Sequence, residues 1–377
     1  MRTDADGQYL GWWELAMLMV ANKLSMLTTY APIVTGAPAT RDAWMAAWIS
    51  TALAFGISGV PFTLLKRFPG QTLFAINTRV LGPWVGRLVN LIYAVLFLHL
   101  TGIAVRLFSE VFVVAMLPET PIWALNTLIV GLGVYGVLSG MEVMGRLADM
   151  VAPMILLTVL GLVILGGSLI QPARLLPLFE YGPGPLIEQS LTPIAIFGEM
   201  SWTLFLVMPY LRRSQDAFKG LWVGALINGI AVSVGAALLI AMMGPHLIDR
   251  EVFPTLTAVR LIRIAEFLTR IEWVMAALWM GAMFVKIALL FFGSVSAFKE
   301  SIPSVKRPVL LGILAVVTLF WAQWIFIDTS ELMASFRPEN ALPVSLSVEL
   351  LLPLLTLTVA MLRSLRGTPR ELAQAHG

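Results

Sequence analysis

The sequence predicts an all-α integral membrane protein with ten transmembrane helices. Hydrophobic residues make up 58% of the chain and charged residues only 12%, whereas soluble domains average about 45–50% and about 25%. A soluble fold of 377 residues could not bury so much apolar surface. The apolar residues also come in runs of about 20, the length that crosses a bilayer as a helix. Lipid is therefore expected to surround most of the chain.

The apolar runs form two sets of five, separated by a polar linker at residues 171–190. The spans are expected at Leu10–Thr35, Ala43–Leu65, Leu88–Leu117, Ile122–Leu138 and Met150–Ile170, then at Leu191–Leu211, Ala217–Met243, Glu272–Ala297, Val309–Ile327 and Leu342–Leu362. A single transmembrane domain, 1–377, would thus contain a first five-helix repeat at 10–170 and a second at 191–362.

Helical spacing of apolar residues over 251–271 predicts an amphipathic extracytoplasmic helix between the seventh and eighth spans. This helix would lie either at the membrane surface or as a cap packed on the bundle. Lys and Arg are about twice as frequent in the connections on the side of the N-terminus as in those on the other side. Both termini are therefore expected in the cytoplasm. No short apolar run with a cleavage site follows the acidic N-terminus, so a removable signal peptide is not expected.

Polar residues and prolines interrupt the first and sixth spans. The first contains Thr28, Thr29 and Pro32, and the sixth contains Phe197-Gly198-Glu199. A proline removes a backbone hydrogen bond within the membrane, and nearby hydroxyls can satisfy the freed carbonyl groups. Such interruptions at the head of each half are typical of transporters that bind solutes near the midplane. Kinks that serve packing alone are the alternative, but their matched positions favour broken helices 1 and 6.

Several charged residues fall inside predicted spans, where a charge costs several kcal/mol. Glu199 would hold a substrate ammonium, carry a proton or cap a half-helix. Lys286 would either supply a cation where another protein binds a metal ion, or pair with a buried carboxylate. Arg106 and Glu110 stand four residues apart and are expected to form a structural pair.

No metalloprotease, phosphate-loop or nucleophile-elbow motif is present, so we expect neither an enzyme nor a cofactor. A glycine pattern at 131–136 lies in an apolar span without a preceding strand, which indicates close helix packing. The absence of cysteine excludes disulfides and thiolate metal sites. The net charge of +3 reflects basic loops, as expected of membrane topology, and does not indicate nucleic acid.

Several strings resemble those of one known family in their order and spacing. They are Asp42-Ala43-Trp44, Arg106 to Glu110, Leu117-Pro118-Glu119-Thr120-Pro121, Gly140-Met141-Glu142-Val143-Met144-Gly145-Arg146, Phe179-Glu180-Tyr181-Gly182-Pro183-Gly184-Pro185, Phe197-Gly198-Glu199, Arg270-Ile271-Glu272, Trp279 and Lys286. Together they resemble the B subunit of endospore germinant receptors, the spore germination permease family. That family is a branch of the amino acid–polyamine–organocation transporter superfamily. The resemblance extends from Leu10 to about Arg366.

This resemblance implies a five-plus-five inverted-repeat transporter fold, with a solute between helices one, three, six and eight. It implies a coupling or cation-site role for Lys286 and substrate-binding roles for Ser25, Thr28, Thr29, Tyr93, Phe197, Gly198 and Glu199. The segment Lys23-Leu24-Ser25-Met26-Leu27-Thr28 departs from the glycine-rich turn common in relatives. Ligand identity is therefore not carried over.

The function that the resemblance implies is nutrient sensing, with an amino acid as the expected ligand. The partners would be the A subunit and the lipoprotein C subunit of a germinant receptor in the spore inner membrane. A proton-coupled amino acid symporter with the same fold is the main alternative. A structural or channel subunit whose site has degenerated is the third.

Overall fold

The computed structural model describes residues 10–26, 40–197, 199–248, 250–262 and 272–367. Within these ranges the chain is almost entirely helical. The β-type pairing within these ranges is one isolated parallel bridge between Leu10 and Leu211.

The helices follow one another along the chain with short connections. They are α1 (Trp12–Leu24), η1 (Thr40–Asp42), α3 (Ala43–Arg67), α4 (Leu73–Leu81), α5 (Pro83–Ala115), α6 (Ile122–Ser139), α7 (Met141–Leu165), η2 (Gly167–Leu169), η3 (Pro172–Leu175), α8 (Pro183–Phe197), α9 (Glu199–Val207), η4 (Met208–Tyr210), α10 (Asp216–Met243), α11 (Pro245–Ile248), α12 (Pro254–Leu261), α13 (Glu272–Ser301), α14 (Arg307–Trp324), α15 (Thr329–Ser335), α16 (Pro338–Leu346), η5 (Ser347–Leu351) and α17 (Leu352–Leu362).

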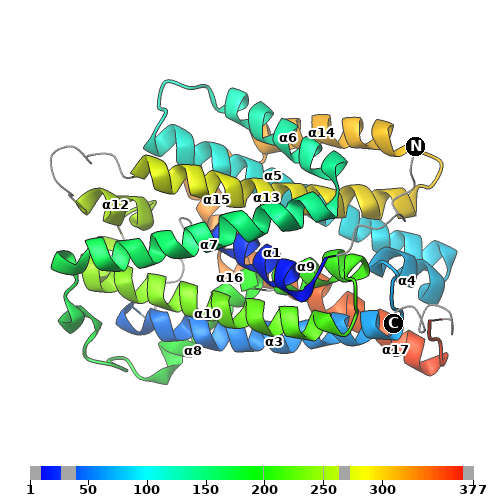
Figure 1. Ribbon diagram of the computed structural model, residues 1–377, viewed down its shortest axis with the longest axis horizontal. Coiled ribbons are helices and arrows are strands. Elements are labelled where there is room, and N and C mark those ends of the chain that lie inside the picture. Colours follow the sequence, from blue (N-terminus) through cyan, green and yellow to red (C-terminus); the bar gives the residue numbers. More distant parts are fainter. Residues whose placement is uncertain (1–9, 27–39, 198, 249, 263–271, 368–377) are drawn as a thin grey trace.

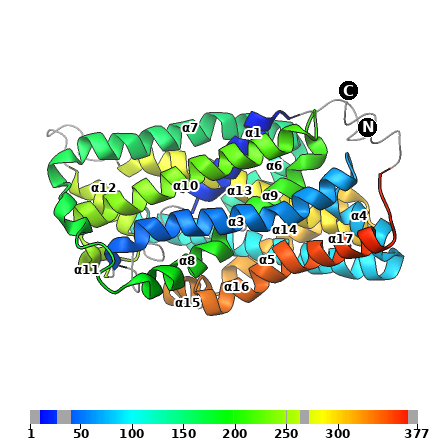
Figure 2. The same cartoon turned by 90° about the horizontal axis from the view of Figure 1, so that it is seen from below.

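The long helices run roughly along the longest axis of the molecule (Figure 1). Helix α13 packs against α5, α6 and α7, while α1 packs against α10, α7 and α13 and so lies inside the bundle. The start of α1 and the end of α17 lie toward the end of the bundle where α4 is found (Figure 2). Helices α11 and α12 lie at the opposite end.

Eight helical segments of the described chain are long and apolar enough to cross a membrane. Apolar side chains cover their outer faces, as expected for contact with lipid: Trp84 is 84% exposed and Trp324 is 70% exposed. The two remaining predicted spans are the ones expected to be broken. Helix α1 ends at Leu24, well inside the first predicted span, and α8 and α9 cover most of the sixth, with Gly198 between them outside the described residues. The prediction of an all-helical membrane protein is confirmed, whereas the division into two repeats stays a prediction.

Among the predicted helix starts, two differ most from the structure. Helix α8 begins at Pro183, inside the stretch predicted as a linker, and α7 begins at Met141 rather than Met150. In both cases the polar first turns of the helix lowered the local hydropathy, which marks the apolar part of a helix rather than its ends. Helix α12 occupies part of the predicted amphipathic segment; residues 263–271 lie outside the described ranges.

Small residues allow the close approach of several helices. A methyl group on Gly136 of α6 would lie 2.6 Å from the Ala288 side chain of α13, and one on Gly133 would lie 3.0 Å from Ile287. Two of the three glycines at 131–136 therefore serve helix packing, as predicted, because a larger side chain at either would separate α6 from α13, whereas Gly131 has nothing within 4 Å of an added methyl group. The predicted pair of Arg106 and Glu110 also forms, at 2.7 Å, with both side chains buried.

Candidate functional site

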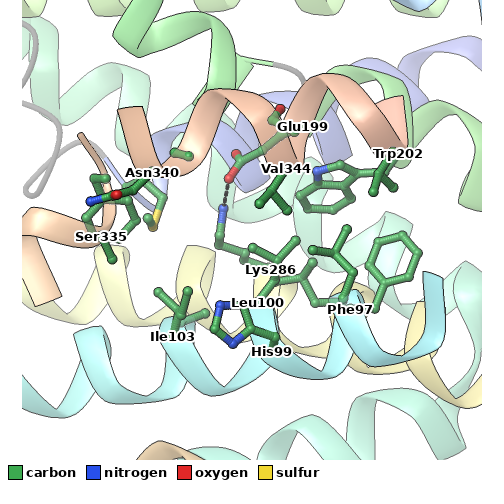
Figure 3. Close-up of a pocket in the computed structure, with 18 of the residues that line it drawn as sticks. Phe97, His99, Leu100, Ile103, Glu199, Trp202, Lys286, Ser335, Asn340 and Val344 are labelled. Carbon is green, nitrogen blue, oxygen red and sulfur yellow. Dashed lines mark hydrogen bonds and ion pairs between the residues drawn. The ribbon is translucent and has the colours of Figure 1, made fainter. Parts of the chain in front are cut away.

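A cavity of about 400 Å³ lies between α5, α9, α13 and the chain from α15 to η5. Apolar and aromatic side chains form most of its wall, with a few polar groups among them. In Figure 3, one face of α5 presents Phe97, His99, Leu100 and Ile103 to the cavity, opposite Val344 of α16. A concave, mostly apolar space with a few convergent polar groups is the usual form of a small-molecule site.

An ion pair stands in the cavity wall. The Lys286 ammonium of α13 donates a hydrogen bond to Glu199 Oε1 of α9 (Figure 3). Their side chains are 4% and 12% exposed, and the Lys286 nitrogen also lies 5.7 Å from the centre of the Trp202 ring. Lys286 has no charged neighbour on its own helix, so its partner must come from another element. Glu199 is in the first turn of α9, where the helix dipole favours a carboxylate.

Two further buried ionisable groups complete a cluster of four. Lys23 of α1 is 2% exposed and Glu349 of η5 is 4% exposed. Lys23 interacts electrostatically with Glu199, Lys286 and Glu349, and Glu349 with Glu199 and Lys23. With all four ionised, two positive and two negative charges cancel. This neutrality matters because each isolated charge within a membrane costs several kcal/mol.

Glu349 is held by an irregular part of the tenth predicted span. In η5 the Leu352 amide donates to the Ser347 carbonyl five residues earlier. That π pattern would pair the Val348 carbonyl with the amide of residue 353, but Pro353 has none. The Tyr93 hydroxyl of α5 donates to this carbonyl instead, at 2.8 Å. The proline thus accounts for both the π turn and its attachment to α5.

Only some of the predicted substrate-binding residues that the structure describes line the cavity. Ser25 is fully buried; its hydroxyl donates to the Asn22 carbonyl at 2.5 Å, and its own carbonyl accepts a hydrogen bond from Trp279 Nε1. Met26, the next residue, lines the cavity, whereas Ser25 is not among the lining residues. Thr28, Thr29 and Gly198 lie outside the described residues, as does the side chain of Phe197.

Tyr93 is fully buried beneath the cavity wall rather than in it. Its ring packs against Phe205 with centroids 5.7 Å apart and against Phe97, itself a lining residue, at 6.3 Å. Of the residues named from the sequence, Glu199 and Lys286 are the two that the structure places together in the cavity wall.

Several lining residues were missed by the sequence reasoning. His99 lines the cavity, and its Nδ1 accepts a hydrogen bond from Trp321 Nε1 at 3.1 Å. Trp202 and Glu349 had no assigned role. Prolines at 343 and 353 on either side of an in-span carboxylate were the available signal for Glu349. In the described part of the chain, no three His, Cys, Asp or Glu residues gather in a way that could hold a metal ion.

Comparisons with known proteins agree with this architecture. Residues 12–328 match the family model described as "Spore germination protein". Spore germination protein KB of Bacillus subtilis (strain 168) is 28% identical over 345 residues, 89% of this chain and 90% of that protein. Spore germination protein YndE of the same organism is 21% identical over 75% of this chain and 78% of its own length.

Solved transporter structures share the fold. A nucleobase–cation-symport-1 family transporter, MHP1, in a closed conformation with bromovinylhydantoin bound, superposes with a TM-score of 0.72 at 12% identity, covering 98% of this chain and 96% of that one. MhsT in complex with L-phenylalanine gives a TM-score of 0.64 at 13% identity, with coverage of 99% and 93%. These similarities show a transporter fold, and the match over residues 12–328 shows that the chain belongs to the spore germination protein family.

Proposed function

We propose that this protein is the solute-sensing subunit of a spore germinant receptor, and that it binds a small nutrient, an amino acid by our expectation, in the cavity beside Glu199 and Lys286. The observation that carries the proposal is the cavity itself: about 400 Å³, mostly apolar, with an ion pair in its wall. A space of this size suits a molecule the size of an amino acid. Family membership supplies the link to germination.

In this proposal the receptor acts with an A subunit and a C subunit in the spore inner membrane, with both termini of the chain in the cytoplasm. Relatives named as spore germination proteins support the biological setting. The fold shared with transporters that were solved with a small molecule bound supports the binding of a small molecule by this chain.

The direct test is a thermal-shift screen of the purified full-length protein against amino acids, nucleosides and sugars. A ligand at a hundredfold excess over its dissociation constant stabilises the folded state by about 2.7 kcal/mol, which such a screen detects. Val344→Trp should abolish the shift because Val344 lines the cavity and the indole would fill it. The matched control is Leu351→Trp, since Leu351 is 56% exposed and is not among the lining residues.

A shift that survives Val344→Trp would place the ligand elsewhere. No shift with any compound, in a protein shown to be folded, would count against solute sensing by this subunit alone.

A proton-coupled symporter is the second candidate, favoured by the fold that the chain shares with symporters and by buried carboxylates at the cavity. Proteoliposomes separate the two functions. Uptake of a screened ligand driven by a pH gradient would identify a symporter, whereas binding without accumulation would identify a receptor.

A further inference from the structure

We propose that Glu349 binds a protonated amine of the solute, so that the cavity selects molecules in which an ammonium group adjoins an apolar body. This inference rests on the proposed function, because it assigns a role within the same cavity. It adds a binding residue on the tenth predicted span, which neither the sequence nor the family resemblance had assigned.

The first support is an unsatisfied acceptor. Glu349 is 4% exposed and lines the cavity. Its carboxylate interacts with the Ser345 hydroxyl, but Oε2 has no hydrogen-bond donor among the described residues. Buried carboxylate oxygens without a donor are rare and costly. An ammonium group, with three N–H donors and a positive charge, would satisfy this oxygen from the cavity side.

The second support is that the other carboxylate in the wall is already engaged. Glu199 Oε1 accepts a hydrogen bond from Lys286 across the cavity wall. An incoming amine at Glu199 would therefore compete with a buried lysine that is covalently fixed in place. At Glu349 no lysine donates a hydrogen bond to Oε2 among the residues that the structure describes, and Lys23 interacts with this carboxylate through its charge alone.

The third support is the rigidity of the element that presents the carboxylate. The π turn is fixed to α5 by the hydrogen bond from Tyr93 to the Val348 carbonyl, and Tyr93 is itself fully buried. π turns inside helices frequently occur at functional sites. A carboxylate held in this way needs little reordering when a ligand arrives, which favours affinity.

The apolar body follows from the rest of the wall. Phe97, Leu100 and Ile103 face Val344 across the space next to the charged cluster (Figure 3). A solute with its ammonium at Glu349 would place a short aliphatic chain against these side chains. Removing that chain from water supplies much of the binding free energy.

The experiment compares two pairs of probes that differ in one group, bound to the full-length protein in detergent. The pairs are 3-methylbutylamine with 3-methylbutan-1-ol, and L-leucine with 2-hydroxy-4-methylpentanoate. We expect the wild type to bind each amine at least tenfold more tightly than its hydroxyl counterpart. Glu349→Gln should remove that preference. Glu339→Gln is the matched control, since Glu339 is an exposed residue of α16 that does not line the cavity.

The preference for amines, measured on folded protein, distinguishes binding from structure. Glu349→Gln removes one negative charge from the neutral cluster beside Lys23 and should lower the thermal midpoint without ligand to some extent in either case. A lower midpoint together with an unchanged preference for amines would show that Glu349 stabilises the fold, through Lys23, and would overturn the inference. If Glu349→Gln does not fold, Glu349→Asp keeps the charge but withdraws it by one methylene, and should weaken the amines alone.

Two further outcomes test the role of Glu349 and the proposed solute sensing independently of each other. Equal binding of amines and alcohols to the wild type would overturn the role of Glu349 while leaving solute sensing intact. Failure of all four probes and of the wider screen on folded protein would overturn both.

Discussion

Breaking the ion pair between Lys286 and Glu199 should be far more damaging than removing it whole. Lys286→Met leaves a buried carboxylate without its partner, since the Glu199 side chain is only 12% exposed. Loss of one member of a buried pair costs about 3–5 kcal/mol, whereas replacing both by uncharged groups of similar size is close to neutral. We therefore expect Lys286→Met to lose about 3–5 kcal/mol of unfolding free energy, and Lys286→Met with Glu199→Gln to recover most of it.

The assay is a double-mutant cycle on unfolding in mixed micelles of sodium dodecyl sulfate and a mild detergent, followed by tryptophan fluorescence. The coupling free energy should be about 2–3 kcal/mol or more and insensitive to salt, because buried charges are little screened. The pair of Arg146 and Glu142 provides the control, since its side chains are 74% and 27% exposed. That pair should give at most about 0.5 kcal/mol. Additive effects of the two substitutions at 286 and 199 would refute the argument that the pair carries the stability.

Three further predictions address packing and hydrogen bonds, each measured in the same unfolding assay. Gly86→Ala should destabilise by about 1–3 kcal/mol, because the added methyl would lie 2.5 Å from the backbone of α4; Gly59→Ala, with nothing within 4 Å, should not. Thr329→Val should lower the unfolding free energy by about 1–2 kcal/mol, because it removes the 3.0 Å hydrogen bond that the Thr329 hydroxyl donates to Glu110. An unchanged unfolding free energy would show that water replaces this hydrogen bond. Tyr93→Phe should cost about 1 kcal/mol and weaken solute binding severalfold, because the π turn loses its attachment to α5; unchanged binding would separate that hydrogen bond from the site.

The sequence predicted the architecture well because a membrane allows few solutions. Every backbone polar group must be satisfied within the chain, so long apolar runs become helices and prolines mark where those helices are interrupted. Helix α1 ends inside the first predicted span, as the break there had indicated, whereas the predicted break in the sixth falls at Gly198, outside the described residues. Polar helix ends, such as the first turns of α7 with Glu142 and Arg146, escaped prediction because hydropathy marks only the apolar part of a helix.

The site was less predictable because it depends on contacts between distant residues. Glu199 and Lys286 were each conspicuous as charges in apolar spans, but they are 87 residues apart and no local pattern joins them. Pairing with a buried carboxylate was one of two interpretations of Lys286, and the structure shows such a pair; the coupling or cation-site role stays a prediction. Glu349 was visible as a charge in a span, yet its place in the cavity depends on a π turn that helical periodicity does not reveal.

Two of the four charged residues of the cluster lie at helix ends where the helix dipole favours their sign. Lys23 lies in the last turn of α1, where the helix dipole favours a cation, and Glu199 lies in the first turn of α9, where it favours an anion. Each dipole contributes about 0.3–1 kcal/mol, up to about 2 in partly buried sites, which is less than the cost of a charge within a membrane. Lys286, in the middle of the unbroken α13, receives no such help. Mutual pairing must therefore supply the remainder, and neutralising any one member should disturb the others.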